Sequence, residues 1–161
     1  MAAAFQWLVL TWRLPSGVST PRVTVWRRLG RLGAVPLTPG AAILPFSEAL
    51  LEQLDWIAEG ITEEGGDAWV LPVGELPEAD EARIKQQSRA DRAEEYRQLE
   101  ITARQMPDES PAADRARRAL DRRLRKVTAR DYFRPPERAT AVKAVARATS
   151  KRRADRDAVR H

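Results

Sequence analysis

A row of basic side chains marks the segment around residues 112–131. They recur three or four residues apart along one side of a helix, with a lysine beside the last: Arg115, Arg118, Arg122, Arg125 and Lys126. Each guanidinium can donate two parallel hydrogen bonds to a phosphate or a carboxylate. We expect these arginines to lack acidic partners at the i,i+4 spacing, so an anionic partner would relieve their mutual repulsion. The spacing therefore predicts a helix face that binds DNA.

The same row could instead pair with acids inside the chain. Residues 78–114 are acidic, and the carboxylates that could pack against the basic helix are Glu81, Asp91, Glu94, Glu95 and Glu100. Arg123 and Arg130 lie nearer the apolar side of that helix, so we expect them to form ion pairs or an interface. Complete pairing is excluded by the charge counts. Residues 115–161 hold 17 basic and 5 acidic residues, net +12, whereas residues 78–114 hold 6 and 10, net −4.

A second basic cluster lies nearer the N-terminus. Arg27, Arg28 and Arg31 share one side of a predicted helix with Thr24, and the apolar residues lie on the other side. We include the three arginines among the candidate DNA-binding residues. The alternative is the ordinary solvated face of an amphipathic helix, which the residue pattern alone favours. Residues 1–77 carry 5 basic and 8 acidic residues, net −3, within a chain of net charge +5.

Composition excludes several classes of catalytic and metal site. The sequence has no cysteine, and its single histidine is the last residue, His161. Thiol catalysis, disulfides, the common zinc sites and histidine-based triads are therefore excluded. Adjacent carboxylates such as Glu63-Glu64 have no companion base, and the sequence has no glycine-rich phosphate loop or hydrolase elbow. We expect no catalytic residue, no bound metal and no cofactor, and therefore a protein that is not an enzyme.

The first half of the chain alternates strand and helix patterns that would position the first basic cluster. We predict, in order, a strand over 6–12, a helix over 19–32, strands over 34–37 and 41–44, a helix over 47–64 and a strand over 68–73. This order is the ferredoxin-like plan of an α+β fold, in which both helices cover one face of an antiparallel sheet. Pro36 and Pro72 cannot donate ladder hydrogen bonds, which puts the second and fourth strands at the edges.

The predicted sheet domain spans residues 1–77, and a helical extension over 78–150 follows it. Prolines divide this extension into three predicted helices, over 78–106, 111–132 and 137–149. The buried stripe that we expect on the last of them consists of Val142, Val145 and Ala146. Residues 151–161 form a basic tail that we expect to be disordered.

Several short motifs follow one another along the chain. They are Trp7-Leu-Val-Leu-Thr-Trp-Arg-Leu-Pro15, Pro21-Arg-Val-Thr-Val-Trp-Arg-Arg-Leu-Gly-Arg-Leu-Gly-Ala34, Ala42-Ile-Leu-Pro45, Arg92-Ala-Glu-Glu-Tyr96, and Leu124 through Asp131-Tyr132-Phe133. Together they resemble the N-terminal domain of ChrB proteins, bacterial regulators associated with chromate resistance. The resemblance implies a DNA-binding transcriptional regulator that acts on chromate-efflux genes. It also implies a second domain in full-length members, so a separate sensor protein could supply the sensing function here.

The first half is also distantly similar to the domain shared by PaaX-type repressors and small CRISPR spacer-acquisition nucleases. Those nucleases place a metal-binding aspartate after the first strand, in a Tyr-Asp-Ile-Pro type sequence. Here the corresponding residues are Trp12-Arg13-Leu14-Pro15. Because arginine cannot ligate a cation, this departure argues against metal-dependent nuclease activity.

The remaining expectations concern location and assembly. No stretch approaches the roughly 20 apolar residues that a bilayer-spanning helix needs, and we interpret the apolar start of the chain as a strand rather than a signal peptide. We expect a cytoplasmic protein with no membrane partner. We also expect a homodimer, because paired half-sites multiply the specificity of a small DNA-binding module. The alternative function is an accessory module that docks on a separate sensor protein and binds no DNA.

Overall fold

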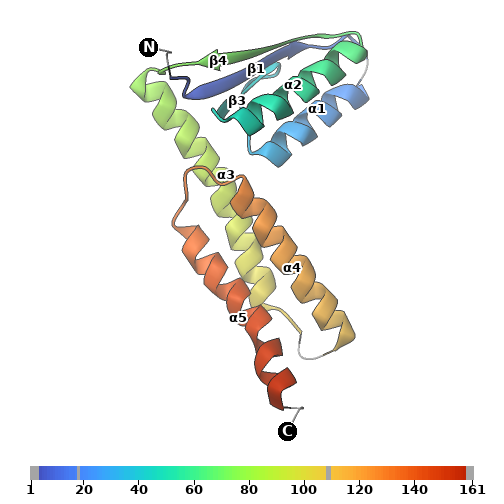
Figure 1. Ribbon diagram of the computed structural model, residues 1–161, viewed down its shortest axis with the longest axis vertical. Coiled ribbons are helices and arrows are strands. Elements are labelled where there is room, and N and C mark those ends of the chain that lie inside the picture. The colour runs from blue at the N-terminus through green and yellow to red at the C-terminus, as the bar shows by residue number, and fades with distance from the viewer. Residues whose placement is uncertain (1–3, 18, 108–109, 159–161) are drawn as a thin grey trace. The chain divides into compact units, whose positions relative to one another are not determined.

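The computed structural model describes the backbone of residues 4–17, 19–107 and 110–158. The chain divides into two units, Met1–Ser88 and Arg89–His161, and the boundary falls inside a long helix. Figure 1 shows an antiparallel sheet with two helices in the first unit and a group of helices in the second. The fold is therefore α+β, as the sequence predicts.

The elements of the first unit follow the order strand, helix, strand, strand, helix, strand. They are β1 (Trp7–Arg13), α1 (Ser19–Leu32), β2 (Val35–Thr38), β3 (Ala41–Pro45), α2 (Glu48–Glu63) and β4 (Asp67–Val73). The four antiparallel strands lie in the order β2-β3-β1-β4, so β2 and β4 are the edges. Pro36 and Pro72 lie in these two edge strands, where a residue without an N–H group is tolerated.

Alternate residues of β1, one of the two inner strands, contribute to the core of the first unit. Leu8, Leu10 and Trp12 are buried, and the first two pair in register with Leu44 and Ala42 of β3. The Trp12 ring meets the ring of Trp26 in α1 edge-on, with centroids 4.9 Å apart. Figure 1 shows α1 and α2 side by side against the sheet, so the exposed sides of both helices belong to one surface.

The ends of α2 are fixed by a serine and two glycines. The Ser47 hydroxyl accepts a hydrogen bond from the Leu50 N–H at 3.1 Å, which caps the first turn. Gly65 has a φ of 82°, a conformation that glycine adopts without strain. A Cβ atom on Gly66 would collide with the carbonyl oxygen of Arg13. The turn from α2 into β4 therefore needs glycine for close approach to β1.

Three helices follow the sheet. They are α3 (Glu78–Arg104), which crosses the boundary between the units, α4 (Pro111–Ala129) and α5 (Glu137–Ala158). Within the second unit they enclose a core of Tyr96, Leu99, Ala103, Leu120, Val127, Ala141, Val145 and Ala148. No described helix is both long enough and apolar enough to cross a membrane.

Several predicted bounds and one predicted stripe are wrong. The helix predicted over 111–132 ends at Ala129, and α5 continues to Ala158 rather than ending near residue 149. Neither glycine nor proline occurs between 149 and 158 to stop it, and residues 159–161 of the predicted tail lie outside the described residues. Val142 and Ala146 are exposed, and the buried face of α5 is formed by Ala141, Val145 and Ala148.

Candidate nucleic-acid interface

Helix α4 separates a buried face from a basic one. Its start is capped by Ser110, whose hydroxyl accepts the Ala113 N–H at 3.0 Å, and Pro111 occupies the first turn. Ala113, Leu120 and Val127 recur seven residues apart and are buried. Because these residues fix the rotation of the helix, the opposite side must face solvent.

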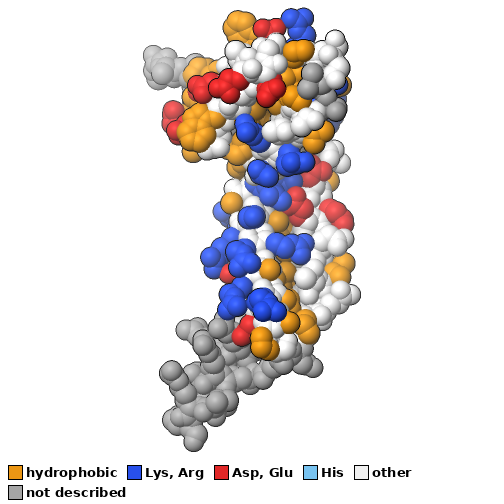
Figure 2. Space-filling view, turned by 90° about the vertical axis from the view of Figure 1, so that its right-hand side faces the viewer, with side chains coloured by type: hydrophobic (Ala, Val, Ile, Leu, Met, Phe, Trp, Pro, Cys, Tyr) orange, Lys and Arg blue, Asp and Glu red, His pale blue; other side chains and the backbone are white. Residues whose placement is uncertain are grey.

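All five basic residues predicted on this helix are exposed. Arg115, Arg118, Arg122, Arg125 and Lys126 share the side of α4 opposite its buried residues. At 1.5 Å per residue, the arginine row extends about 15 Å along the helix. Figure 2 views the molecule from the side on which α4 lies in Figure 1, and basic side chains run along that face. The structure therefore brings these five predicted residues onto one surface.

The arginine row contains one ion pair that differs from the expectation from the sequence. Arg125 lies 2.6 Å from Asp121 at the i,i+4 spacing, which corrects the expectation that the row has no such partner. Both side chains are well exposed, so the pair stabilises the helix by about 0.5 kcal/mol at most. Within the described part of the chain, Arg115, Arg118 and Arg122 make no ion pair. Asp114 and Asp121 lie four residues before and three residues after Arg118, but they pair with Arg117 and Arg125.

The acids of α3 pair mainly with cations of their own helix. Glu81 pairs with Lys85, Glu94 with Arg97, and Glu100 with Arg104. Neutralisation of α4 by these acids, the alternative considered from the sequence, is therefore not seen for the exposed arginines among the described residues.

Arg130, at the end of α4, does reach an acid of α3. Its guanidinium lies 2.6 Å from Glu95, which also contacts Arg92 of α3 at 3.1 Å. The Arg130 side chain is largely buried, so the expectation of an ion pair near the apolar side is confirmed for this residue. Arg123, of which the same was expected, is exposed. It lines a shallow groove with Lys126 and Glu94.

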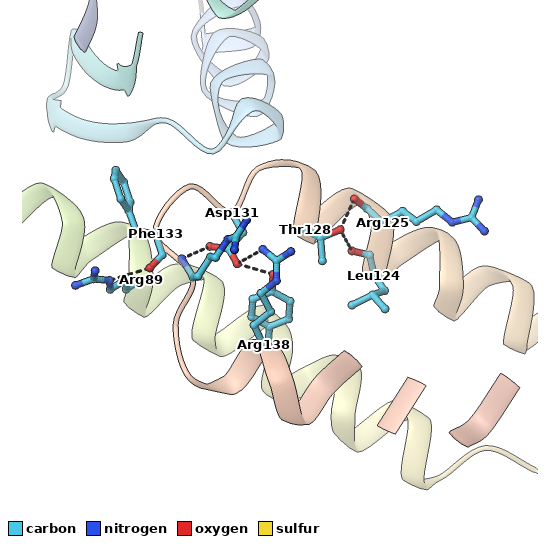
Figure 3. Close-up of polar contacts among 9 residues, drawn as sticks. Arg89, Leu124, Arg125, Thr128, Asp131, Phe133 and Arg138 are labelled. Carbon is cyan, nitrogen blue, oxygen red and sulfur yellow. Dashed lines mark hydrogen bonds and ion pairs between the residues drawn. The ribbon is translucent and has the colours of Figure 1, made fainter. Parts of the chain in front are cut away.

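A buried aspartate that sequence reasoning missed fixes the end of α4. Asp131 accepts hydrogen bonds from the Tyr96 hydroxyl at 2.7 Å, from Arg138 at 3.1 Å and from the Arg134 N–H at 2.9 Å. Asp131 lies in the loop between α4 and α5, and Figure 3 shows Arg138 of α5 turned toward it. The donors come from α3, from this loop and from α5, so one carboxylate ties three segments together. Arg134 has a φ of 44°, a strained value for a residue other than glycine.

The surroundings of Tyr96 and Tyr132 raise the pKa of both side chains. Burial raises the pKa of Tyr96 above its ordinary value of 10.0, and the hydrogen bond to Asp131 raises it further. Burial also raises the pKa of Tyr132, although the positive charges of Arg92 and Arg130 partly oppose this. The sequence does contain a sign of this network. Tyr96 lies on the apolar stripe of α3, and a buried tyrosine hydroxyl needs a hydrogen-bond acceptor.

The cluster on α1 lies beside an acidic helix. Arg27, Arg28 and Arg31 are exposed, as the sequence predicts. The neighbouring α2 has no lysine or arginine, and its five acids are Glu48, Glu52, Asp55, Glu59 and Glu63. The guanidinium of Arg28 extends over α2, since a Cβ atom on Gly60 would lie 3.4 Å from its Nη1. This surface therefore carries both signs of charge, whereas on α4 the exposed basic residues outnumber the acids Asp114 and Asp121.

The residue that corresponds to the nuclease aspartate has an acidic partner. Arg13, at the end of β1, lies 2.9 Å from Asp67 at the start of β4. Both side chains are exposed. Across the described residues, no three acidic or histidine side chains lie close enough together to hold a metal ion.

Comparison with known proteins agrees with the motifs. The family model described as "Protein ChrB, N-terminal" matches residues 22–109, from within α1 to five residues past the end of α3. Protein ChrB of Cupriavidus metallidurans is 31% identical over 140 residues, which cover 84% of this chain and 42% of that protein. The chain thus spans less than half the length of this relative, and no solved structure matches it. The chain belongs to the family of ChrB N-terminal domains.

Proposed function

We propose that this chain is a transcriptional regulator linked to chromate resistance, and that it binds DNA through the exposed arginines of α4. Membership of the ChrB family supports the link to chromate resistance. The observation that best supports DNA binding is the row of Arg115, Arg118 and Arg122. This row is exposed and forms no ion pair within the described residues. Such a row suits the phosphates of a nucleic acid backbone.

The charge balance of the second unit supports the same proposal. Residues 89–161 hold 21 basic and 12 acidic residues, net +9, so internal pairing cannot neutralise this unit. Residues 1–88 hold 7 basic and 11 acidic residues, net −4. We therefore assign the principal DNA contact to α4 and a secondary contact to the arginines of α1, which lie beside the acids of α2.

We further propose a ferredoxin-like sheet domain, a homodimeric assembly and a binding role rather than an enzymatic one. The strand order β2-β3-β1-β4 supports the ferredoxin-like plan. Trp56 and Trp69 are 58% and 68% exposed, and large exposed apolar side chains of this kind are enriched at interfaces between subunits. The Arg13–Asp67 ion pair supports a role other than metal-dependent cleavage.

DNA binding is tested with a duplex from the upstream region of the protein's own gene, followed by fluorescence anisotropy. Arg118→Glu/Arg122→Glu reverses two charges on α4 and should weaken binding at least tenfold. Arg27→Glu/Arg28→Glu, a matched reversal on α1, should weaken it less. All four residues are exposed, so both variants should keep the melting temperature of the unaltered protein. Equal affinity of the α4 variant and the unaltered protein would contradict the proposal.

A second candidate function is docking on a separate sensor protein. The observation that favours it is the exposed apolar pair Trp69 and Leu71 on the edge strand β4. The two candidates differ in their response to competing DNA. A regulator should keep its upstream duplex in the presence of excess unrelated duplex, whereas a docking module should bind both weakly and alike.

A further inference from the structure

A cavity of about 550 Å³ lies within the second unit, away from the exposed face of α4. It is formed by the end of α3, the beginning of the loop that follows, one side of α5, and a single residue of α4, Arg117. Four of its lining residues are basic, namely Arg104, Arg117, Lys143 and Arg147. Glu100 is its one acidic lining residue among the described residues, so the cavity walls carry an excess of positive charge.

Arg117 is the buried cation of this cavity. The residue is 7% exposed. Its guanidinium lies 3.4 Å from the carbonyl oxygen of Pro107 and 3.5 Å from a carboxylate oxygen of Asp114, both long for hydrogen bonds. Its Nε is buried and has no hydrogen-bond partner. The terminal nitrogens are thus held only by long contacts, and an anion in the cavity would give this largely buried guanidinium a closer acceptor.

Two further cations reach the cavity from α5. Lys143 and Arg147 lie one turn apart, so their side chains share a face of the helix. Both are exposed, and neither makes an ion pair within the described residues. Arg104, by contrast, pairs with Glu100. The charge available to a ligand therefore comes from Lys143 and Arg147, and in part from Arg117, whose charge is shared with Asp114 at 3.5 Å.

The rest of the described lining is mostly apolar and includes Ala103, Met106 and Ala144, whereas Thr140 contributes a hydroxyl. Cavities of roughly 300–1,000 Å³ with a few converging polar groups are typical of small-molecule sites. A bare tetrahedral oxyanion would fill only a small part of this volume and would leave the apolar wall uncovered. A phosphate ester instead carries nearly two negative charges and three acceptor oxygens, which match three separate cations.

We propose that this cavity binds a phosphorylated small organic molecule. The phosphate contacts Arg117, Lys143 and Arg147, and the organic part packs against Ala103, Met106 and Ala144. The proposal does not depend on DNA binding, because none of these six residues belongs to the exposed row of α4.

The test is calorimetric titration of the full chain with 4-methylumbelliferyl phosphate, in parallel with 4-methylumbelliferone and with inorganic phosphate. The ester should bind saturably with a Kd of about 100 μM or lower, and each of its two parts should bind at least tenfold more weakly. Lys143→Ala/Arg147→Ala should weaken binding of the ester at least tenfold. Arg115→Ala/Arg122→Ala removes the same charge from the exposed face of α4 and should change binding less than twofold.

Three results would overturn the proposal. The first is absence of saturable binding of the ester. The second is inorganic phosphate binding as tightly as the ester, because the organic part would then contribute nothing. The third is an equal loss of binding in the two double variants, which would indicate general attraction to positive charge. Melting temperatures of both variants, measured alongside, separate a lost site from a lost fold.

Discussion

Asp131 shows how one side chain can organise the second unit. It accepts hydrogen bonds from Tyr96 in α3, from Arg138 in α5 and from the backbone of Arg134. The carboxylate is almost fully buried, so each of these donors depends on it for satisfaction. Because the loop that contains Asp131 directly follows α4, the same contacts fix the end of the helix that carries the basic face.

Replacement of this carboxylate should destabilise the protein strongly. Asp131→Ala leaves the Tyr96 hydroxyl and the Arg138 guanidinium without their acceptor, and should lower the free energy of unfolding by about 3 kcal/mol. Urea denaturation measures the change. Asp121→Ala is the matched control, since it removes an exposed carboxylate paired with Arg125 and should change the free energy by less than about 0.5 kcal/mol. Similar losses in both variants would contradict the role given to Asp131.

The two tyrosines should make stability depend on pH in the alkaline range. Both pKa values are raised in the folded state, Tyr96 chiefly by burial and then by Asp131, and Tyr132 chiefly by burial. An unfolded chain ionises its tyrosines near the ordinary value of 10.0. Their contribution to folding is therefore fully present below that pH and is lost as the pH rises through the folded-state pKa values.

Absorbance of tyrosinate during an alkaline titration checks this directly. The folded protein should show little tyrosinate at the pH where the urea-unfolded protein is half ionised. The sequence contains 2 tyrosines, so the signal belongs to these two residues alone. Coincident titration curves for folded and unfolded protein would show that neither phenol is shielded.

At the scale of elements, the sequence predicted most clearly what is set by local patterns. Proline cannot donate a ladder hydrogen bond, so Pro36 and Pro72 placed β2 and β4 at the edges of the sheet. The spacing of the arginines on α4 predicted their common exposed face, because the buried residues of that helix recur on the other side.

Most of what the sequence did not predict depends on contacts between elements. The burial of Asp131 requires Tyr96, 35 residues earlier, to lie opposite it. The predicted stripe of α5 is right for Val145 and wrong for Val142 and Ala146. Alanine occurs on all sides of that helix, so periodicity could not separate Ala141 from Ala146. The Arg125–Asp121 pair is local, and the i,i+4 spacing of the two residues would have predicted it.

The turn from α2 into β4 offers a test of element packing. Gly66→Ala would place a Cβ atom against the carbonyl oxygen of Arg13 and 2.9 Å from Cγ2 of Ile61, so it should lower the free energy of unfolding by about 2 kcal/mol. Gly74→Ala is the matched control, because a Cβ atom there meets nothing within 4 Å. Thermal and urea denaturation compare the two variants, and equal stabilities would contradict the described packing of the turn.

At the scale of the whole molecule, the two units differ in charge. The first carries net −4 and the second net +9, although the chain as a whole carries +5. An anionic polymer should therefore be attracted to the second unit and weakly repelled by the first. This asymmetry supports placing the proposed DNA contact in the second unit, and the exposed arginine row narrows the proposal to α4.

The salt dependence of DNA affinity tests this central claim most directly. Each phosphate neutralised contributes about −0.9 to the slope of log K against log salt concentration. Arg118→Glu/Arg122→Glu should therefore reduce the steepness of the slope by about 1.8 per protomer, whereas Arg27→Glu/Arg28→Glu should change it by less than half as much. A slope unchanged by the α4 variant, or reduced equally by both variants, would contradict the assignment of DNA binding to α4.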